Sequence, residues 1–135
     1  MKPCEVCGRP GHKHHIVFRS QGGMDIKVNY AYLCVYHHEY GPEAVHTCRA
    51  TDLRLKVCMQ RQLESMFSDT EYRIEDIAKS VECSRKKLQA AMKTVHHRNG
   101  TYRREDIIRF FMGGKLYDDL GDGEELEREH CEWLM

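Results

Sequence analysis

Two stretches decide the fold of this chain: CEVCGRPGHKHHIVF at residues 4–18 and LCVYHHEYGPEAVH at residues 33–46. The first 48 residues hold six of the nine His and four of the seven Cys. Inside a cell thiols stay reduced, so paired Cys at short spacing are better explained as metal ligands than as disulfides. The metal chemistry of the chain is therefore expected near its N-terminus.

The first predicted site combines two pairs of ligands with the same spacing. Cys4 and Cys7 enclose two residues, and Cys34 and His37 repeat that spacing 30 positions later. Four soft nitrogen and sulfur ligands suit tetrahedral zinc, which would staple the intervening strands together. We therefore predict a structural Zn²⁺ site formed by Cys4, Cys7, Cys34 and His37. Cys48 and His12 remain alternatives to His37 as the fourth ligand.

A second group of polar residues is not used by this zinc site. It contains His14, His15, His38 and His46, together with Asn29. Ile16-Val17-Phe18 and Tyr30-Ala31-Tyr32-Leu33 are prone to form strands, and the Gly22-Gly23 pair between them is typical of a turn. The second group is therefore expected around a strand, a loop and a strand.

Taken in order, these pieces resemble the HNH endonuclease family. The resemblance covers roughly residues 4–60 and rests on Cys4-x-x-Cys7, His14-His15-Ile16-Val17, Gly22-Gly23, Asn29, Leu33-Cys34-x-x-His37-His38 and Val45-His46. It implies a ββα-metal fold in which a hairpin and a helix hold one catalytic divalent ion. By position it implies His15 as general base, Asn29 as the residue that fixes the loop and orients the base, and His14, His38 and His46 as metal ligands. The chain departs from the commonest pattern at His37, where Cys is more usual.

The residues themselves favour the same chemistry. Phosphodiester hydrolysis needs a water molecule that loses its proton near neutral pH, and the unperturbed pKa of His makes His15 a competent acceptor. A divalent cation compensates charge on the phosphate, and imidazole ligands suit Mg²⁺ or Mn²⁺, with Ni²⁺, Co²⁺ or Zn²⁺ as alternatives, rather than Ca²⁺. Adjacent residues of a strand point to opposite faces, so only one of His14 and His15 is expected to be a ligand. The choice of His14 follows from the resemblance.

The C-terminal half has the outline of a DNA-binding module. A connecting helix is predicted to begin at Thr51 within residues 51–69, followed over residues 70–117 by two helices with an N-cap at Ser84. This pattern is similar to a winged helix-turn-helix, with a hairpin at Asn99-Gly100 between residues 95–97 and 101–103 as the wing. The predicted DNA contacts are Arg85, Lys86, Lys87, Gln89, Lys93, Arg98, Arg103 and Arg104. A helical cap with solvated cations is the alternative, and no internal repeat is apparent.

The formal net charge of zero conceals segments of opposite sign. By our count, residues 1–50 carry +2, residues 51–117 carry +5 and residues 118–135 carry −7. The zero balance therefore does not exclude a nucleic-acid partner. The acidic C-terminal tail is expected to be a short helix docked by Trp133, with a frayed end as the alternative. A sharper hypothesis is that the tail lies on the basic body and competes with DNA.

The sequence thus predicts an α+β protein: an HNH module over residues 1–50, a connecting helix, a helix-turn-helix-like module and the acidic tail. We expect a metal-dependent endonuclease that hydrolyses DNA, with RNA as an alternative substrate; a non-catalytic zinc-dependent DNA-binding regulator is the competing hypothesis. No apolar run approaches the length of a membrane span, and the N-terminus resembles no secretory signal. A cytoplasmic monomer or homodimer, in a bacterial or phage-infected host cell, is therefore expected.

Overall fold

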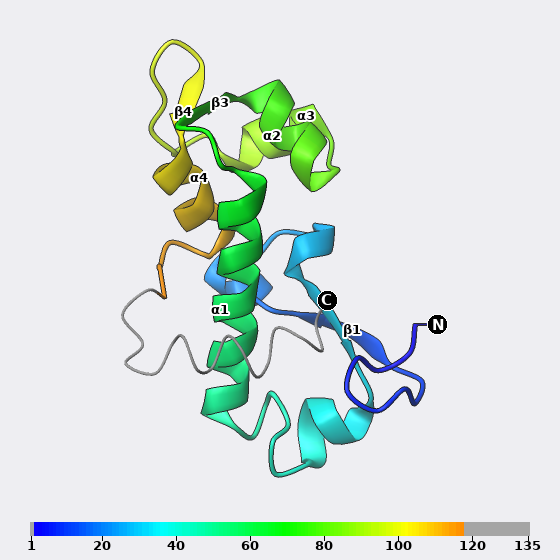
Figure 1. The fold of residues 1–135 in the computed structure, drawn as a ribbon. Coiled ribbons are helices and arrows are strands. Elements are labelled where there is room, and N and C mark those ends of the chain that lie inside the picture. The colour runs from blue at the N-terminus through cyan, green and yellow to red at the C-terminus, as the bar shows by residue number, and fades with distance from the viewer. Residues whose placement is uncertain (1, 118–135) are drawn as a thin grey trace.

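The computed structural model describes residues 2–117. It is a mixed α+β structure with two small antiparallel sheets, β1–β2 and β3–β4, arranged around the long helix α1 (Figure 1). The element bounds are β1 His12–His15, β2 Tyr30–Leu33, a π-helical turn Tyr36–Tyr40, α1 Arg49–Met66, β3 Glu71–Arg73, α2 Ile74–Val81, α3 Arg85–Ala91, β4 Thr101–Arg103 and α4 Arg104–Phe111. No helix among residues 2–117 is long and apolar enough to cross a membrane.

The N-terminal hairpin begins earlier than the sequence predicts. β2 is the expected strand, but β1 lies at His12–His15 rather than at Ile16–Phe18, and His15 pairs with Tyr30. The ladder ends there because the Asn29 side chain bonds both backbone groups of Val17, so these groups are not available to a neighbouring strand. The prediction of a strand at residues 16–18 is therefore wrong.

Helix α1 connects the two ends of the molecule. It begins at Arg49, two residues before the predicted Thr51, with Cys48 as N-cap residue. Its buried face includes Leu55 and Leu63, both with no exposed surface, and the chain then places Phe67 in a stacked arrangement with Phe111 of α4. The C-terminal elements therefore share a core with α1.

The predicted turn at Asn99-Gly100 is present, but its strand has another partner. Asn99 and Gly100 have φ values of 53° and 79°, and Arg98 pairs with Thr101 across them. The strand β4 that follows pairs with β3, which precedes α2, rather than with residues 95–97. The wing-like hairpin expected from adjacent segments is thus replaced by a long-range pairing around the two helices.

This pairing reveals an internal repeat that the sequence analysis missed. Residues 72–77 read YRIEDI and residues 102–107 read YRREDI. Each copy is a three-residue strand followed at once by an eight-residue helix, and Tyr72 pairs with Tyr102 at the centre of the β3–β4 ladder. Because the register is symmetric about that pair, the two β–α units meet in a two-fold symmetric manner.

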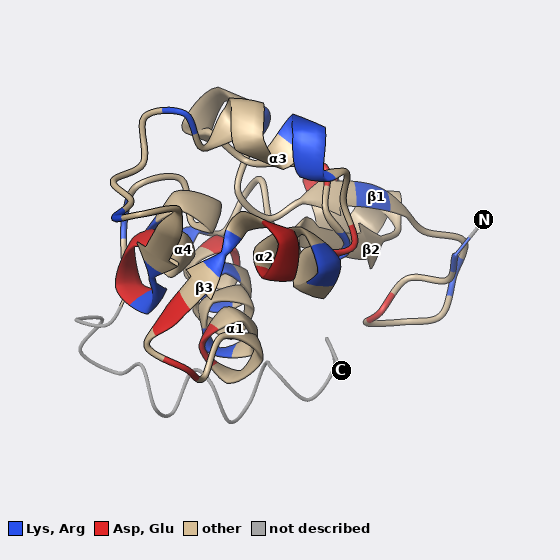
Figure 2. Ribbon diagram, turned by 90° about the horizontal axis from the view of Figure 1, so that it is seen from above, with Lys and Arg blue, Asp and Glu red and all other residues tan. Residues whose placement is uncertain are grey.

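The two helices predicted around Ser84 are present as α2 and α3, with Ser84 Oγ accepting a bond from the Lys87 N–H at 3.4 Å. Helix α3 ends at Ala91, so Val95 lies beyond it. Lys and Arg residues cluster at one end of α3 in the view from above (Figure 2).

Gly113, with φ of 78°, lies so close to the loop after β1 that a Cβ there would be 2.4 Å from the Gln21 carbonyl oxygen. The loop that borders the histidines is therefore supported from the C-terminal module.

Candidate metal centres

The first cluster has the geometry of a tetrahedral metal site. The Sγ atoms of Cys7 and Cys34 lie 3.6 Å apart, and His37 Nδ1 lies 3.6 Å from Cys4 Sγ and 3.3 Å from Cys34 Sγ. Bonds of about 2.3 Å to sulfur and 2.0 Å to nitrogen at tetrahedral angles would separate the ligand atoms by about 3.5–3.8 Å. Cys4, Cys7, Cys34 and His37 can therefore hold a metal such as zinc.

The local electrostatics support metal binding by thiolate. Burial alone would raise the pKa of the Cys4 thiol, but bonds from the backbone of Cys34, Cys7 and Val6 and from the His37 side chain lower it to about 6. A thiol that ionises below neutral pH is ready to act as a metal ligand. Of the three candidates for the fourth ligand, only His37 belongs to this cluster; His12 lies beside the other histidines, and Cys48 is the N-cap residue of α1.

The second cluster consists of His14, His38 and His46, whose ligand atoms lie within 4.8 Å of one another. His38 Nε2 lies 3.0 Å from His14 Nδ1 and 2.8 Å from His46 Nε2. A neutral imidazole offers a single lone pair, so His38 Nε2 cannot satisfy two neighbouring donors at once. His14 Nε2 is also buried with no hydrogen-bond partner among the described residues. Three converging imidazoles fit a divalent cation better than they fit a hydrogen-bond network.

Burial and neighbouring charges keep His14 and His38 neutral. Burial, followed by the charges of His38 and His46, lowers the pKa of His14 to about 3. Burial, followed by His46 and His12, lowers the pKa of His38 to about 4. Both side chains therefore offer lone pairs at neutral pH, which is the form a metal ligand requires.

His12 is not a member of this cluster but contacts it through His38, which the sequence did not reveal. It lies on the same side of β1 as His14, and its Nε2 atom contacts Nδ1 of His38. A bond there directs the other nitrogen of His38, Nε2, toward His14 and His46. His12, considered for the zinc site from sequence, is thus placed to orient a ligand of the second cluster.

His15 lies on the other face of β1 and outside the histidine cluster, as strand alternation requires. Its Nε2 atom lies 2.7 Å from Asp25 Oδ1, and Asp25 also receives bonds from Arg19. The bonds to His15 and then Arg19 hold the pKa of Asp25 below its usual range. Neither Asp25 nor Arg19 was singled out from sequence.

The Asn29 amide holds together the loop between the two strands. It is fully buried, its Oδ1 accepts from the Val17 N–H at 2.7 Å, and its Nδ2 donates to the carbonyls of Val17 at 3.0 Å and Met24 at 2.9 Å. Both ends of the loop are thereby tied to the start of β2. The predicted loop-fixing role of Asn29 agrees with these contacts.

The predicted DNA-contacting residues fall into two groups. Lys86, Lys87, Gln89, Lys93, Arg98 and Arg103 are exposed. Arg85 is exposed but paired with Glu75 at 3.1 Å. Arg104 differs, because its guanidinium donates to the carbonyls of Phe67 at 2.6 Å and Glu64 at 3.0 Å and so closes the end of α1. We therefore remove Arg104 from the set; the acidic tail lies outside the described residues.

No protein-family model, curated protein or solved structure matches this chain. What its sites do must therefore be argued from their residues and geometry.

The tetrahedral site can be tested with Cys4→Ser. We expect elemental analysis to show that the variant has lost one equivalent of zinc. Its melting temperature should fall by at least about 10 °C, because metal binding contributes to the free energy of folding. Cys48→Ser is the matched control and should retain both, since Ser is also a good N-cap. Loss of zinc from the control, or full retention in Cys4→Ser, would show that the ligand set is wrong.

The loop clasp can be tested with Asn29→Ala. Removing the amide leaves backbone groups of Val17 and Met24 without partners in a buried place, so unfolding in urea should show a loss of about 3 kcal/mol. Gln89→Ala removes an exposed amide from α3 and should change stability by less than about 0.5 kcal/mol. Equal effects of the two substitutions would contradict the structural role given to Asn29.

Proposed function

We propose that this protein is a metal-dependent endonuclease that hydrolyses DNA phosphodiester bonds, as its resemblance to the HNH family implies. The observation that carries the proposal is that histidines suited to two different roles line one open hollow of about 290 Å³. One wall supplies the metal-ligand group His14, His38 and His46, and another supplies His15, which is outside that group. Metal-dependent hydrolysis of a phosphodiester by this route needs both a cation site and a separate proton acceptor beside it.

The roles follow from the positions of the side chains. His14, His38 and His46 would hold a divalent ion, with Mg²⁺ or Mn²⁺ favoured, which supplies Lewis-acid stabilisation of phosphate charge when bound. His15 accepts a proton from the attacking water. Arg19 and Lys13 also line the hollow and provide positive charge for the flanking phosphates. The products are a 5′-phosphate and a 3′-hydroxyl, whose oxygen takes its proton from solvent.

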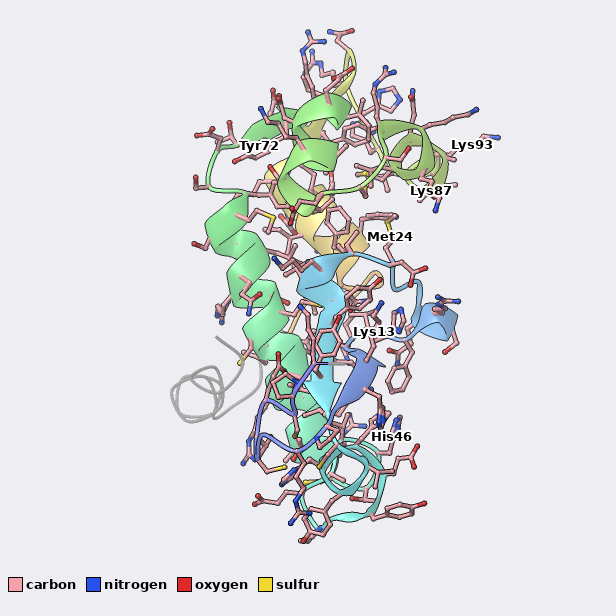
Figure 3. The ribbon with its side chains drawn as sticks, turned by 90° about the vertical axis from the view of Figure 1, so that its right-hand side faces the viewer. Lys13, Met24, His46, Tyr72, Lys87 and Lys93 are labelled. Atoms are coloured by element: carbon pink, nitrogen blue, oxygen red, sulfur yellow. The ribbon has the colours of Figure 1, made fainter. Side chains whose placement is uncertain are left out.

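The C-terminal module would extend the contact along the same duplex. Lys87 and Lys93 project toward the same side of the molecule as His46, near opposite ends of α1 (Figure 3). Helix α1 has 18 residues and is therefore about 27 Å long, the length of roughly eight base pairs. A duplex along this side would touch both the hollow and the exposed cations of α3, so these cations would set the register while the hollow cleaves. In this proposal α2 and α3 act as a helix-turn-helix unit that contacts the duplex through α3.

The catalytic assignment is tested with His15→Ala in a plasmid-nicking assay with Mg²⁺ or Mn²⁺ against EDTA. We expect at least a 100-fold loss of nicking, the lower end of what a general base contributes, with zinc content and melting temperature unchanged. His97→Ala, which removes an exposed histidine of the C-terminal module, is the control. Undiminished nicking by His15→Ala would contradict the assignment, and a metal-loaded wild type that binds but never nicks DNA would favour the non-catalytic regulator.

The DNA-contacting role of α3 and its flank is tested by replacing Lys87 and Lys93 together with Ala. If each neutralises one phosphate, the slope of log affinity against log salt should fall by about two. Lys115→Ala removes a cation from the segment that bonds α1 through Tyr117 and Gln60, and should leave the slope unchanged. An unchanged slope in the double variant would favour the alternative of a helical cap with solvated cations.

A further inference from the structure

The carboxylate of Asp25 contacts both His15, the proposed proton acceptor, and Arg19, the proposed phosphate-binding cation. Asp25 Oδ1 lies 2.7 Å from His15 Nε2 and 3.0 Å from the Arg19 guanidinium, whose distance to Oδ2 is 3.1 Å. His15 and Arg19 both line the hollow, whereas Asp25 does not. Asp25 therefore reaches the hollow only through these two side chains.

The backbone around Asp25 is held from both sides, although the carboxylate itself is half exposed. The carbonyl of the preceding residue, Met24, accepts a hydrogen bond from the buried Asn29 amide at 2.9 Å, and the following residue, Ile26, is 2% exposed. The Tyr30 ring meets the His15 ring edge to face, with centroids 5.2 Å apart. The carboxylate and the imidazole are thus each supported by residues anchored at the start of β2.

We propose that Asp25 is the positioning residue for His15, an inference that rests on the proposed nuclease function. The carboxylate accepts a hydrogen bond from the N–H at His15 Nε2, so the lone pair of the neutral imidazole lies on Nδ1. No hydrogen bond to Nδ1 is found within residues 2–117. The water proton passes to Nδ1, the resulting hydroxide bonds to phosphorus, and the bond from phosphorus to the leaving 3′-oxygen breaks. Asp25 remains ionised throughout and offsets the charge of the imidazolium that forms.

Arg19 completes the arrangement. A guanidinium carries five N–H donors, and the recorded contacts to Asp25 come from one nitrogen. Arg19 thus holds the carboxylate in place while keeping donors for a phosphate oxygen in the hollow. One carboxylate therefore sets the distance between the proton acceptor and a cation that would grip the substrate.

The kinetic test compares Asp25→Asn in two backgrounds. In the otherwise unchanged chain we expect kcat for plasmid nicking to fall about 10- to 100-fold with KM changed less than threefold, the size typical of a residue that orients another. In the His15→Ala background the same substitution should lower kcat no further, because its effect on kcat acts through the missing imidazole. Asp69→Asn, an exposed acid-to-amide change beyond α1, is the matched control. Equal losses in both backgrounds, or an effect on KM alone, would overturn the proposal.

A second measurement separates this proposal from the nuclease assignment. Long-range ¹H–¹⁵N correlation spectra of the ¹⁵N-labelled full chain at about pH 8 report which nitrogen of neutral His15 carries the proton, with the signal identified by its loss in His15→Ala. We expect the Nε2–H form in the wild type and a shift toward Nδ1–H in Asp25→Ala. A tautomer that ignores Asp25 would overturn the positioning role whether or not the protein cuts DNA. An Asp25-dependent tautomer in a chain that never nicks DNA would overturn only the nuclease function.

Discussion

The structure of the N-terminal half depends on the cluster of Cys4, Cys7, Cys34 and His37, which joins the N-terminal segment to the turn after β2. The hairpin between them has four-residue strands, and an isolated two-stranded hairpin is at best marginally stable in water. Binding a metal at this cluster adds binding free energy to folding free energy. Because His37 lies in the π-helical turn, a metal bound to it would also fix that turn and the neighbouring residue His38. The structural site therefore also positions a ligand of the second cluster.

The C-terminal module also depends on α1, and the two copies of its repeat contribute to this contact differently. At equivalent positions the first copy has Ile74, which is 7% exposed and packs into the core, and the second has Arg104. Arg104 instead satisfies carbonyls at the end of α1, where a helix otherwise leaves its last acceptors without partners. One unit thus supplies packing while the other closes α1, and together they fix the module on the helix that leads from the histidines.

What the sequence could predict was set by how local the signal is. The cluster of Cys4, Cys7, Cys34 and His37, which could hold a metal, follows from two short spacings, so it could be predicted without tertiary information. The exception is the fourth member, because the spacings alone left Cys48 and His12 as alternatives to His37. The first strand was misplaced because the Asn29 side chain, 12 residues away in sequence, competes for the backbone of Val17. The partner of β4 was missed because its pairing with β3 spans 30 residues, and only the repeated YR-x-EDI motif could have indicated it. Asp25 carries no motif of its own; its role depends on the loop that brings it to His15.

The adjacent histidines His14 and His15 place the strictest demand on the register of the β1–β2 pairing. His14 and His15 can take different roles only because strand residues alternate between faces, so a slip of one residue between β1 and β2 would exchange their positions. Short strands specify their register weakly, and here a buried side chain adds that specificity: the Asn29 amide bonds Val17 two positions after His15 and Met24 one position before Asp25. A shifted register would break these bonds and would also separate His15 from Asp25. The residue that ends the ladder therefore also fixes which histidine faces His38 and His46 and which faces the Asp25 carboxylate.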